Sequence, residues 1–211
     1  MYRKRGPRTP LQQLALVVAA ALAVGIGYYL GNRMSGETFH VPSSPRVLSA
    51  PAEPAALEAF DLRDHYDRPF TPAQLAGHWT LVASGETSDA EACRRTLTRL
   101  VLVHNQLVDR PDLQRSFQAV FLTRMPQIDT AQALKDLVTF YSPDFLGVRG
   151  DADQLGRLAQ ALGLADEQPG GGPDTGFALV DPEGRFRGRF TPAESPATIA
   201  GDLKSLARSP H

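Results

Sequence analysis

Apolar and polar positions follow two different periods along most of the chain. Largely apolar runs at Trp79–Ala83 and Ala119–Thr123 are typical of buried strands. Between and after these runs, apolar residues recur at spacings of three and four, which is the pattern of amphipathic helices. The pattern predicts helices over residues 90–107, 131–141 and 152–162.

Turn signals predict two hairpins. Phe60–Asp64 and Arg68–Phe70 flank a polar tip, and Pro69 restricts this hairpin to the edge of a sheet. A second hairpin is expected over residues 175–190, because the turn Asp181-Pro-Glu-Gly184 separates two apolar runs. Residues that favour helix N-caps begin the predicted helical segments: Thr71, Asp89, Asp129, Asp151 and Ser195.

The order of these elements predicts the fold class. After the small hairpin come strand, helix, strand, helix, helix, strand, strand and helix. A mixed sheet with helices on both faces follows from this order, with the closing hairpin supplying antiparallel strands. This is an α/β fold with the thioredoxin-like layout.

The N-terminal part has the charge pattern of a membrane anchor. Four basic residues precede an uncharged run from Pro10 to Gly31, which as a helix can cross the hydrocarbon layer of about 30 Å. Because only Arg33 follows the run closely, the positive-inside rule places the N-terminus in the cytoplasm and the rest outside. The predicted segments are a basic tail (1–10), a single transmembrane anchor (11–31), a flexible tether (32–54) and a folded domain (55–208).

This topology predicts a single-pass protein of the cytoplasmic membrane with its domain in the periplasm, or on the outer side. A cleaved signal peptide is the alternative, since a charged start and an apolar centre fit one equally well. The run offers no small-residue cleavage site where it ends, which favours a retained anchor.

Composition limits the chemistry of the exported domain. Cys93 is the only cysteine, so the chain can form no internal disulfide and no zinc site built mainly on cysteine. The formal net charge of -1 combines a basic start with an acidic remainder, which argues against nucleic acid as a partner.

Several short motifs in a fixed order resemble the Sco/SenC family of membrane-anchored, thioredoxin-fold copper chaperones that help to build the copper centre of cytochrome c oxidase. The resemblance covers nearly the whole exported domain. The matching motifs are Phe60-Asp-Leu, Leu75-Ala-Gly-His-Trp79, Gly85-x-Thr87, Thr96-Leu97, Pro126-x-x-Asp129-Thr130, Phe145-Leu-Gly147 and Leu179-Val-Asp-Pro-Glu-Gly-Arg-Phe186.

The resemblance implies a copper site that this sequence keeps only in part. Family members bind copper through two cysteines, three residues apart, and a histidine before the closing hairpin. Matched to this chain, these ligands fall on Asp89, Cys93 and a position on or near Asp174. Copper is therefore implied by the family, but a lone thiolate with two carboxylates is a poor site for copper(I), which prefers soft ligands.

Each residue of this site also has a structural interpretation. Cys93 is a candidate reactive thiol near a helix N-terminus, yet free cysteines are often buried, and Glu86, Asp89 and Glu91 would raise its pKa. Asp89 and Asp174 could hold a hard cation together with Glu86, or could simply cap a helix and occupy a turn. The other candidate copper ligands, His65, His78 and Met125, follow no ligand-like spacing.

Three functions remain open from the sequence. The first is a non-enzymatic accessory protein of cytochrome c oxidase assembly or envelope copper handling, which acts through contacts with oxidase subunits or other assembly factors. The second is a single-cysteine thiol peroxidase or thiol-redox partner, which requires a lowered pKa and solvent access at Cys93. The third is an interaction module unrelated to the oxidase.

Overall fold

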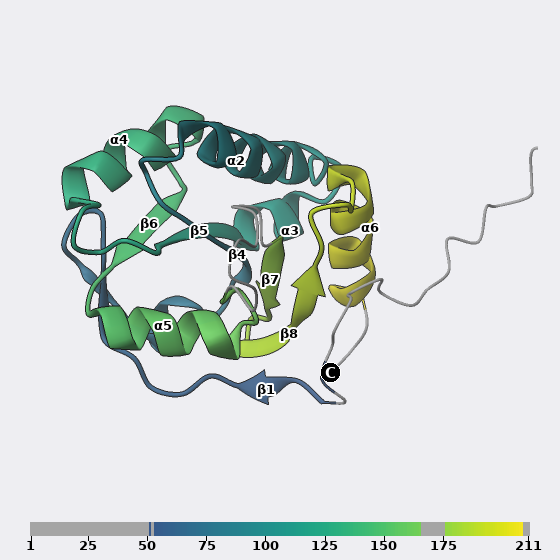
Figure 1. The fold of residues 1–211 in the computed structure, drawn as a ribbon. Helices are drawn as coiled ribbons and strands as arrows, with labels where there is room; N and C mark the ends of the chain where they lie inside the picture. Colours follow the sequence, from purple (N-terminus) through teal and green to yellow (C-terminus); the bar gives the residue numbers. More distant parts are fainter. Residues whose placement is uncertain (1–50, 52, 166–175, 209–211) are drawn as a thin grey trace, which may run out of the picture. The chain divides into compact units, whose positions relative to one another are not determined.

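The structure is a computed structural model that describes residues 51, 53–165 and 176–208. Eight strands of these residues form one mixed sheet in the order β1-β8-β7-β4-β5-β6-β2-β3 (Figure 1). The strands are β1 (Ala55–Ala56), β2 (Leu62–Asp64), β3 (Pro69–Phe70), β4 (Trp79–Gly85), β5 (Phe117–Thr123), β6 (Leu146–Arg149), β7 (Phe177–Val180) and β8 (Arg185–Phe190). The helices are a 3-10 turn (Pro72–Gln74), α2 (Ala90–Asn105), α3 (Pro111–Ser116), α4 (Ala131–Tyr141), α5 (Ala152–Ala161) and α6 (Pro196–Leu206).

Strand β4 is central to the sheet. It pairs in parallel with β5 from Trp79 to Gly85 and antiparallel with β7, while β5 pairs in parallel with β6. The β7–β8 and β2–β3 hairpins supply the antiparallel strands. The mixed sheet confirms the predicted thioredoxin-like fold.

Helices cover both faces of the sheet, with α2, α4 and α6 on one face and α5 on the other (Figure 1). Alternation along β4 supplies both layers, because successive side chains of a strand point to opposite faces. Leu81 packs in the core cluster beneath α2, and Val82 packs in the cluster beneath α5; both are buried. The central strand is buried on both faces and is therefore mostly apolar, with Thr80 and Ser84 as its buried polar residues.

Most predicted elements are present near their expected bounds. Pro69 lies in the edge strand β3, Asp151 caps α5, and Ser195 caps α6 through its hydroxyl. The sequence pattern does not predict β1, α3 or β6. These are short, and β6 contains Gly147, so neither period is sustained long enough to be recognised.

The predicted cap of α4 was wrong by one residue. Thr130, not Asp129, is the N-cap, and its hydroxyl accepts a hydrogen bond from the N–H of Ala133 at 3.1 Å. Asp129 is instead 1% exposed and binds other parts of the chain. Both residue types favour helix starts, so local preference could not distinguish them.

The predicted tail, the anchor (11–31) and nearly all of the tether (32–54) lie outside the described residues. Among the helices that the structure does describe, none is both long enough and apolar enough to cross a membrane.

Candidate functional site

The candidate site lies where β4 ends and the chain turns into α2. Phe121 of the neighbouring strand lies against Gly85, the last residue of β4, and leaves no room for a side chain there. A Cβ at this position would lie 2.8 Å from the ring atom Cζ of Phe121, closer than real carbon atoms approach. The carbonyl of Gly85 accepts a hydrogen bond from the N–H of Arg124 at 2.8 Å, which continues the β4–β5 pairing into the loops.

A buried carboxylate joins the two loops at this end of the sheet. Asp129 accepts hydrogen bonds from the N–H of Thr87 at 3.2 Å and from its hydroxyl at 2.6 Å. The second oxygen of Asp129 accepts the hydroxyl of Thr123 at the end of β5. The motifs Gly85-x-Thr87 and Pro126-x-x-Asp129-Thr130 therefore touch each other directly, and we refer to Thr87, Thr123 and Asp129 as the threonine–aspartate clasp.

Asp89 caps α2. Its carboxylate accepts the N–H of Ala92 at 2.9 Å, and its own N–H donates to the carbonyl of Glu86 at 3.2 Å. Such a cap satisfies one of the free N–H groups of the first helical turn and stabilises the helix by about 1 kcal/mol. The structural interpretation of Asp89 is therefore the one that the geometry supports.

Cys93 lies one turn into α2 and faces the core. It is 2% exposed, and its thiol donates a hydrogen bond to the carbonyl of Glu86 at 3.1 Å. Burial raises the pKa of the thiol to about 11, with further contributions from the carboxylates of Asp89, Asp129 and Glu86. At neutral pH the thiol is protonated, which is the opposite of an activated nucleophile.

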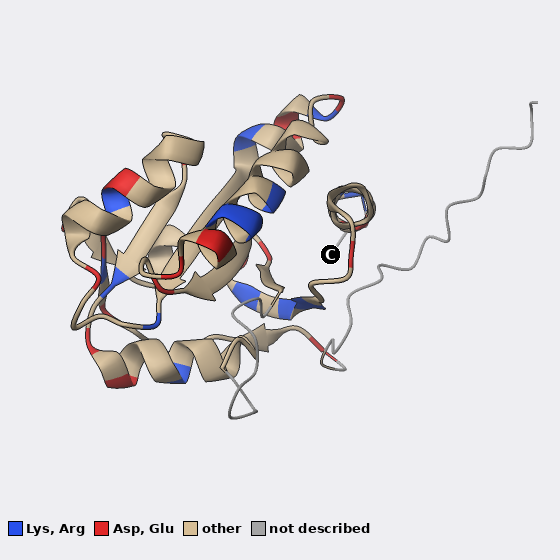
Figure 2. Cartoon of the chain, turned by 45° about the horizontal axis from the view of Figure 1, so that its top comes forward, with Lys and Arg blue, Asp and Glu red and all other residues tan. Residues whose placement is uncertain are grey.

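The acidic residues around the thiol differ in one respect from those expected. Glu91 does not act on Cys93, because it pairs with Arg94 at 2.7 Å and Arg95 at 3.2 Å on the exposed face of α2. Figure 2 shows this face as adjoining acidic and basic segments of the helix. Asp129, distant in sequence, takes the place that Glu91 was expected to have.

The space beside Cys93 is small. A cavity of about 20 Å³ lies there, with Glu86, Asp89 and Phe121 among its walls. That volume is enough for about one water molecule. A hydroperoxide substrate or the cysteine of a partner protein could reach Cys93 only if the loop between β4 and α2 opened. The observed geometry therefore disfavours thiol-redox chemistry at Cys93.

The described residues do not fit a copper ion. Copper(I) takes soft ligands, whereas Cys93 is the only thiol in the chain and the hard carboxylate of Asp89 is occupied by its helix. Nowhere among residues 53–165 and 176–208 do three His, Cys, Asp or Glu side chains gather as a metal site would require. Asp174, the third predicted position, lies outside the described residues.

The other candidate ligands lie in separate places. The ring of His65 is buried in the β2–β3 turn, where its Nδ1 accepts the N–H of Gly147 at 3.0 Å. His78 directly precedes β4, at the opposite end of that strand from Cys93. Met125 lies in the loop after β5, half-buried, and its N–H donates to the hydroxyl of Thr123 at 3.0 Å. The structure does not bring these three residues to the Cys93 end as a ligand set.

The sheet order and the β4–α2 junction define a thioredoxin-like domain. A sequence model of the SCO1/SenC family matches residues 49–208, so the chain belongs to that family.

Individual relatives agree with this assignment. A protein of Stutzerimonas stutzeri that carries a copper-binding designation is 34% identical over 151 residues, covering 68% of this chain and 72% of the relative. The mitochondrial SCO2 homolog of Bos taurus is 28% identical over 211 residues, covering 96% of this chain and 78% of the homolog.

A solved relative shows the same fold. The crystal structure of yeast Sco1 with copper bound superposes with a TM-score of 0.64 at 23% identity, covering 75% of this chain and 91% of that chain.

Proposed function

We propose that this chain is an accessory protein of cytochrome c oxidase assembly or envelope copper handling that acts through protein contacts and does not itself carry copper. Membership of the SCO1/SenC family supports the role in oxidase assembly, because the resemblance to that family implies this process. One observation supports action without bound copper: the position matched to a copper-binding cysteine is Asp89, whose carboxylate is used as a helix cap.

The state of Cys93 supports the same conclusion. Its thiol is buried, hydrogen-bonded to a carbonyl and protonated at neutral pH. In this role the residue stabilises the start of α2 and contributes no ligand. The threonine–aspartate clasp keeps the loops of the family scaffold in place, so the surface that partners would recognise can persist without the metal.

Copper(I) binding by the full chain in lipid nanodiscs, measured against a competing chelator, tests the proposal. We expect no stoichiometric binding by the wild type. Asp89→Cys introduces a second thiol at the matched position, and a higher copper(I) affinity in that variant would show that the assay detects a thiol pair on this scaffold. Tight binding of one copper(I) by the wild type would contradict the proposal.

The partner class needs a separate measurement. After crosslinking in intact membranes, capture of the tagged chain should enrich subunits of the oxidase or its assembly factors over a tagged membrane protein of another family. If the captured partners belong to neither group, the chain is an interaction module outside oxidase assembly, and this part of the proposal fails.

We also propose that residues 11–31 anchor the chain in the cytoplasmic membrane, with residues 55–208 on the outer side. The uncharged run and the preceding basic residues support this topology. Carbonate washing should leave the protein in the membrane fraction, and protease added to spheroplasts should remove the domain. A soluble form that starts near Arg33 would identify a cleaved signal peptide, and a protease-resistant domain would show the opposite topology.

A further inference from the structure

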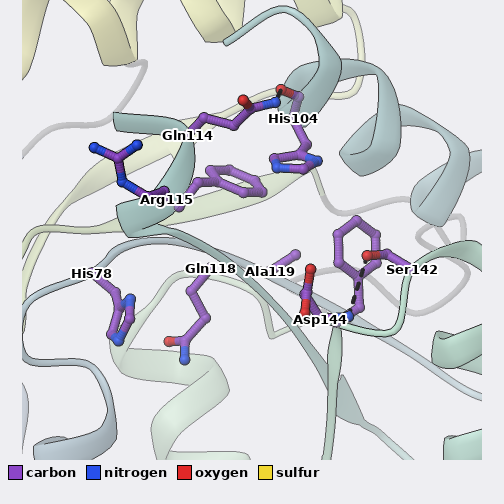
Figure 3. Close-up of a pocket in the computed structure, with 10 residues that line it drawn as sticks. His78, His104, Gln114, Arg115, Gln118, Ala119, Ser142 and Asp144 are labelled. Carbon is purple, nitrogen blue, oxygen red and sulfur yellow. Dashed lines mark hydrogen bonds between the residues drawn. The ribbon is translucent and has the colours of Figure 1, made fainter. Parts of the chain in front are cut away.

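A pocket in the part of the chain that the structure describes lies at the opposite end of β4 and β5 from Cys93. Its volume is about 570 Å³, within the range of about 300 to 1,000 Å³ that is common for ligand sites. It is bounded by His78 before β4, the first residues of β5, the last turns of α2, helix α3 and the segment that leads into β6 (Figure 3).

One wall of this pocket is an open flank of a strand. Strand β5 pairs with β4 along all seven of its residues, but it pairs with β6 only from Val120 to Leu122. Phe117, Gln118 and Ala119 therefore have a strand neighbour on one side only within the described sheet. The pocket lies on their other side, between these three residues and the segment 142–145.

Two polar side chains beside this flank have polar atoms without a partner in the described part of the chain. Gln118 uses its oxygen to accept the hydroxyl of Thr80 at 3.0 Å, which leaves its NH₂ group directed away from that bond. The Nδ1 atom of His78 is buried and has no partner among the described residues. In Figure 3 these two side chains lie on the same side of the pocket.

The rest of the pocket combines an apolar surface with opposite charges. Phe117 stacks on His104 with ring centres 5.6 Å apart, and Ala119 and Phe145 extend the apolar surface. Arg115 and Asp144 lie on opposite sides of the pocket (Figure 3). Arg115 also pairs with Asp112, but both side chains are more than two-thirds exposed, so the pair is weak and the guanidinium can turn to a ligand.

We propose that this pocket binds a short extended peptide segment, which adds to the open flank of β5 as a strand. An apolar side chain of the peptide would contact Phe117, and an acidic and a basic residue on either side would face Arg115 and Asp144. Strand addition draws its affinity from main-chain hydrogen bonds and its specificity from the pockets beside the strand. A metal does not fit, because the pocket holds no group of three ligating side chains among the described residues.

Peptide binding at this pocket can be tested separately from copper binding near Cys93, because the pocket lies at the other end of the central strands.

A probe of matching chemistry is the peptide acetyl-Glu-(4-fluorophenylalanine)-Lys amide, observed by fluorine NMR with the full chain in lipid nanodiscs and with empty nanodiscs as the blank. We expect saturable broadening of the fluorine signal. A second peptide with methylated backbone nitrogens keeps the side chains but loses the strand donors, and it should bind about tenfold more weakly.

The protein variants are chosen to change one group at a time. Gln118→Glu keeps the oxygen that Thr80 contacts and replaces the NH₂ group with a second oxygen, so peptide affinity should fall about tenfold. Gln160→Glu makes the same chemical change on the exposed side of α5 and should leave affinity unchanged. Because the side chain of Arg115 is exposed, the variant Arg115→Gln should fold normally. It should weaken binding of the peptide with Glu more than binding of the same peptide with Gln in place of Glu.

Three results would overturn the proposal. The first is no broadening beyond that with empty nanodiscs, and the second is equal affinity of the methylated and unmethylated peptides. The third is full displacement of the peptide by 4-fluorobenzoate at equal concentration, which would identify a site for small anions. Urea unfolding of Gln118→Glu, compared with the wild type, shows whether a loss of binding reflects the pocket or the fold.

Discussion

The two ends of strand β4 differ in how completely their polar groups are paired. At the Cys93 end, the thiol, the Asp89 carboxylate and the clasp all have partners, and the cavity is about 20 Å³. At the His78 end, a ring nitrogen has no partner among the described residues, a strand flank is open and the pocket is about 570 Å³. The end that contains the positions matched to the copper-binding cysteines is closed, and the opposite end has room for a ligand.

The largest expected effect concerns the reactivity of Cys93. With the thiol pKa raised from 9.0 to about 11, the thiolate fraction at pH 8 is lower by about a hundredfold, and burial slows the reaction further. Iodoacetamide should therefore label the folded chain at least about a hundred times more slowly than the chain in urea.

The same shift gives a pH dependence of stability. The thiol of Cys93 keeps its proton up to a higher pH in the folded state than in the unfolded state. The free energy of unfolding therefore falls as the pH rises from 9.0 to about 11. Cys93→Ala should remove this part of the pH dependence. Fast labelling at pH 8 under native conditions would show that the Cys93 end opens and would erase the contrast between the two ends.

Asp129→Ala should destabilise the protein by about 2 to 4 kcal/mol, because it leaves the hydroxyls of Thr87 and Thr123 and the N–H of Thr87 without their acceptor. Urea unfolding measures the loss. Asp136→Ala, on the exposed face of α4, is the matched control and should change stability by less than about 0.5 kcal/mol. Similar losses in both variants would mean that the clasp does not hold the loops.

Gly85→Ala should cost about 1 to 3 kcal/mol, because the new methyl group would overlap the ring of Phe121. Gly156→Ala in α5 meets no atom within 4 Å and should stabilise the helix by up to about 1 kcal/mol. Phe121→Leu in the Gly85→Ala background should recover part of the loss. Equal effects of the two glycine substitutions would show that the Cys93 end is less tightly packed than the structure indicates.

His65, in the β2–β3 turn, shows how burial changes the pKa of an ionisable group away from the two ends of β4. Burial lowers the pKa of its imidazole, with Arg68 and Lys135 acting in the same direction and Asp64 opposing them. The unfolded chain therefore binds a proton more readily, and stability falls as the pH drops below 6.5, by up to about 1.4 kcal/mol per pH unit. His65→Asn keeps an acceptor for the N–H of Gly147 and should flatten this slope in urea unfolding between pH 7 and 5.

The smallest expected effect is at the open end. His78→Leu removes a ring whose Nδ1 has no partner in the described part of the chain, so the free energy of unfolding should change by less than about 0.5 kcal/mol. A loss comparable with that of Asp129→Ala would mean that His78 is structural, and the contrast between the two ends would then need another explanation.

Periodicity predicted the fold because the elements that define it are long. Strands β4 and β5 and helices α2, α4 and α5 sustain one pattern for several residues, whereas β6 has only four residues and was missed. The burial of Cys93 followed from the general tendency of free cysteines. The anchor and Asp174 remain predictions, because they lie outside the described residues.

Two features could not be predicted because they depend on contacts between distant residues. Asp129 lies 42 residues from Thr87, and its local sequence is equally suited to a helix cap. The pocket at the His78 end joins residues from β5, α2 and the segment before β6, and its open flank results from where the β5–β6 register begins. Register is a tertiary property that no single segment reveals.

The cap formed by Asp89 has a thermodynamic consequence for any metal at this position. A cysteine at position 89 would give up the helix cap, at a cost of about 1 kcal/mol. A metal bound there would therefore have to offset the loss of the cap as well as the desolvation of its own ligands.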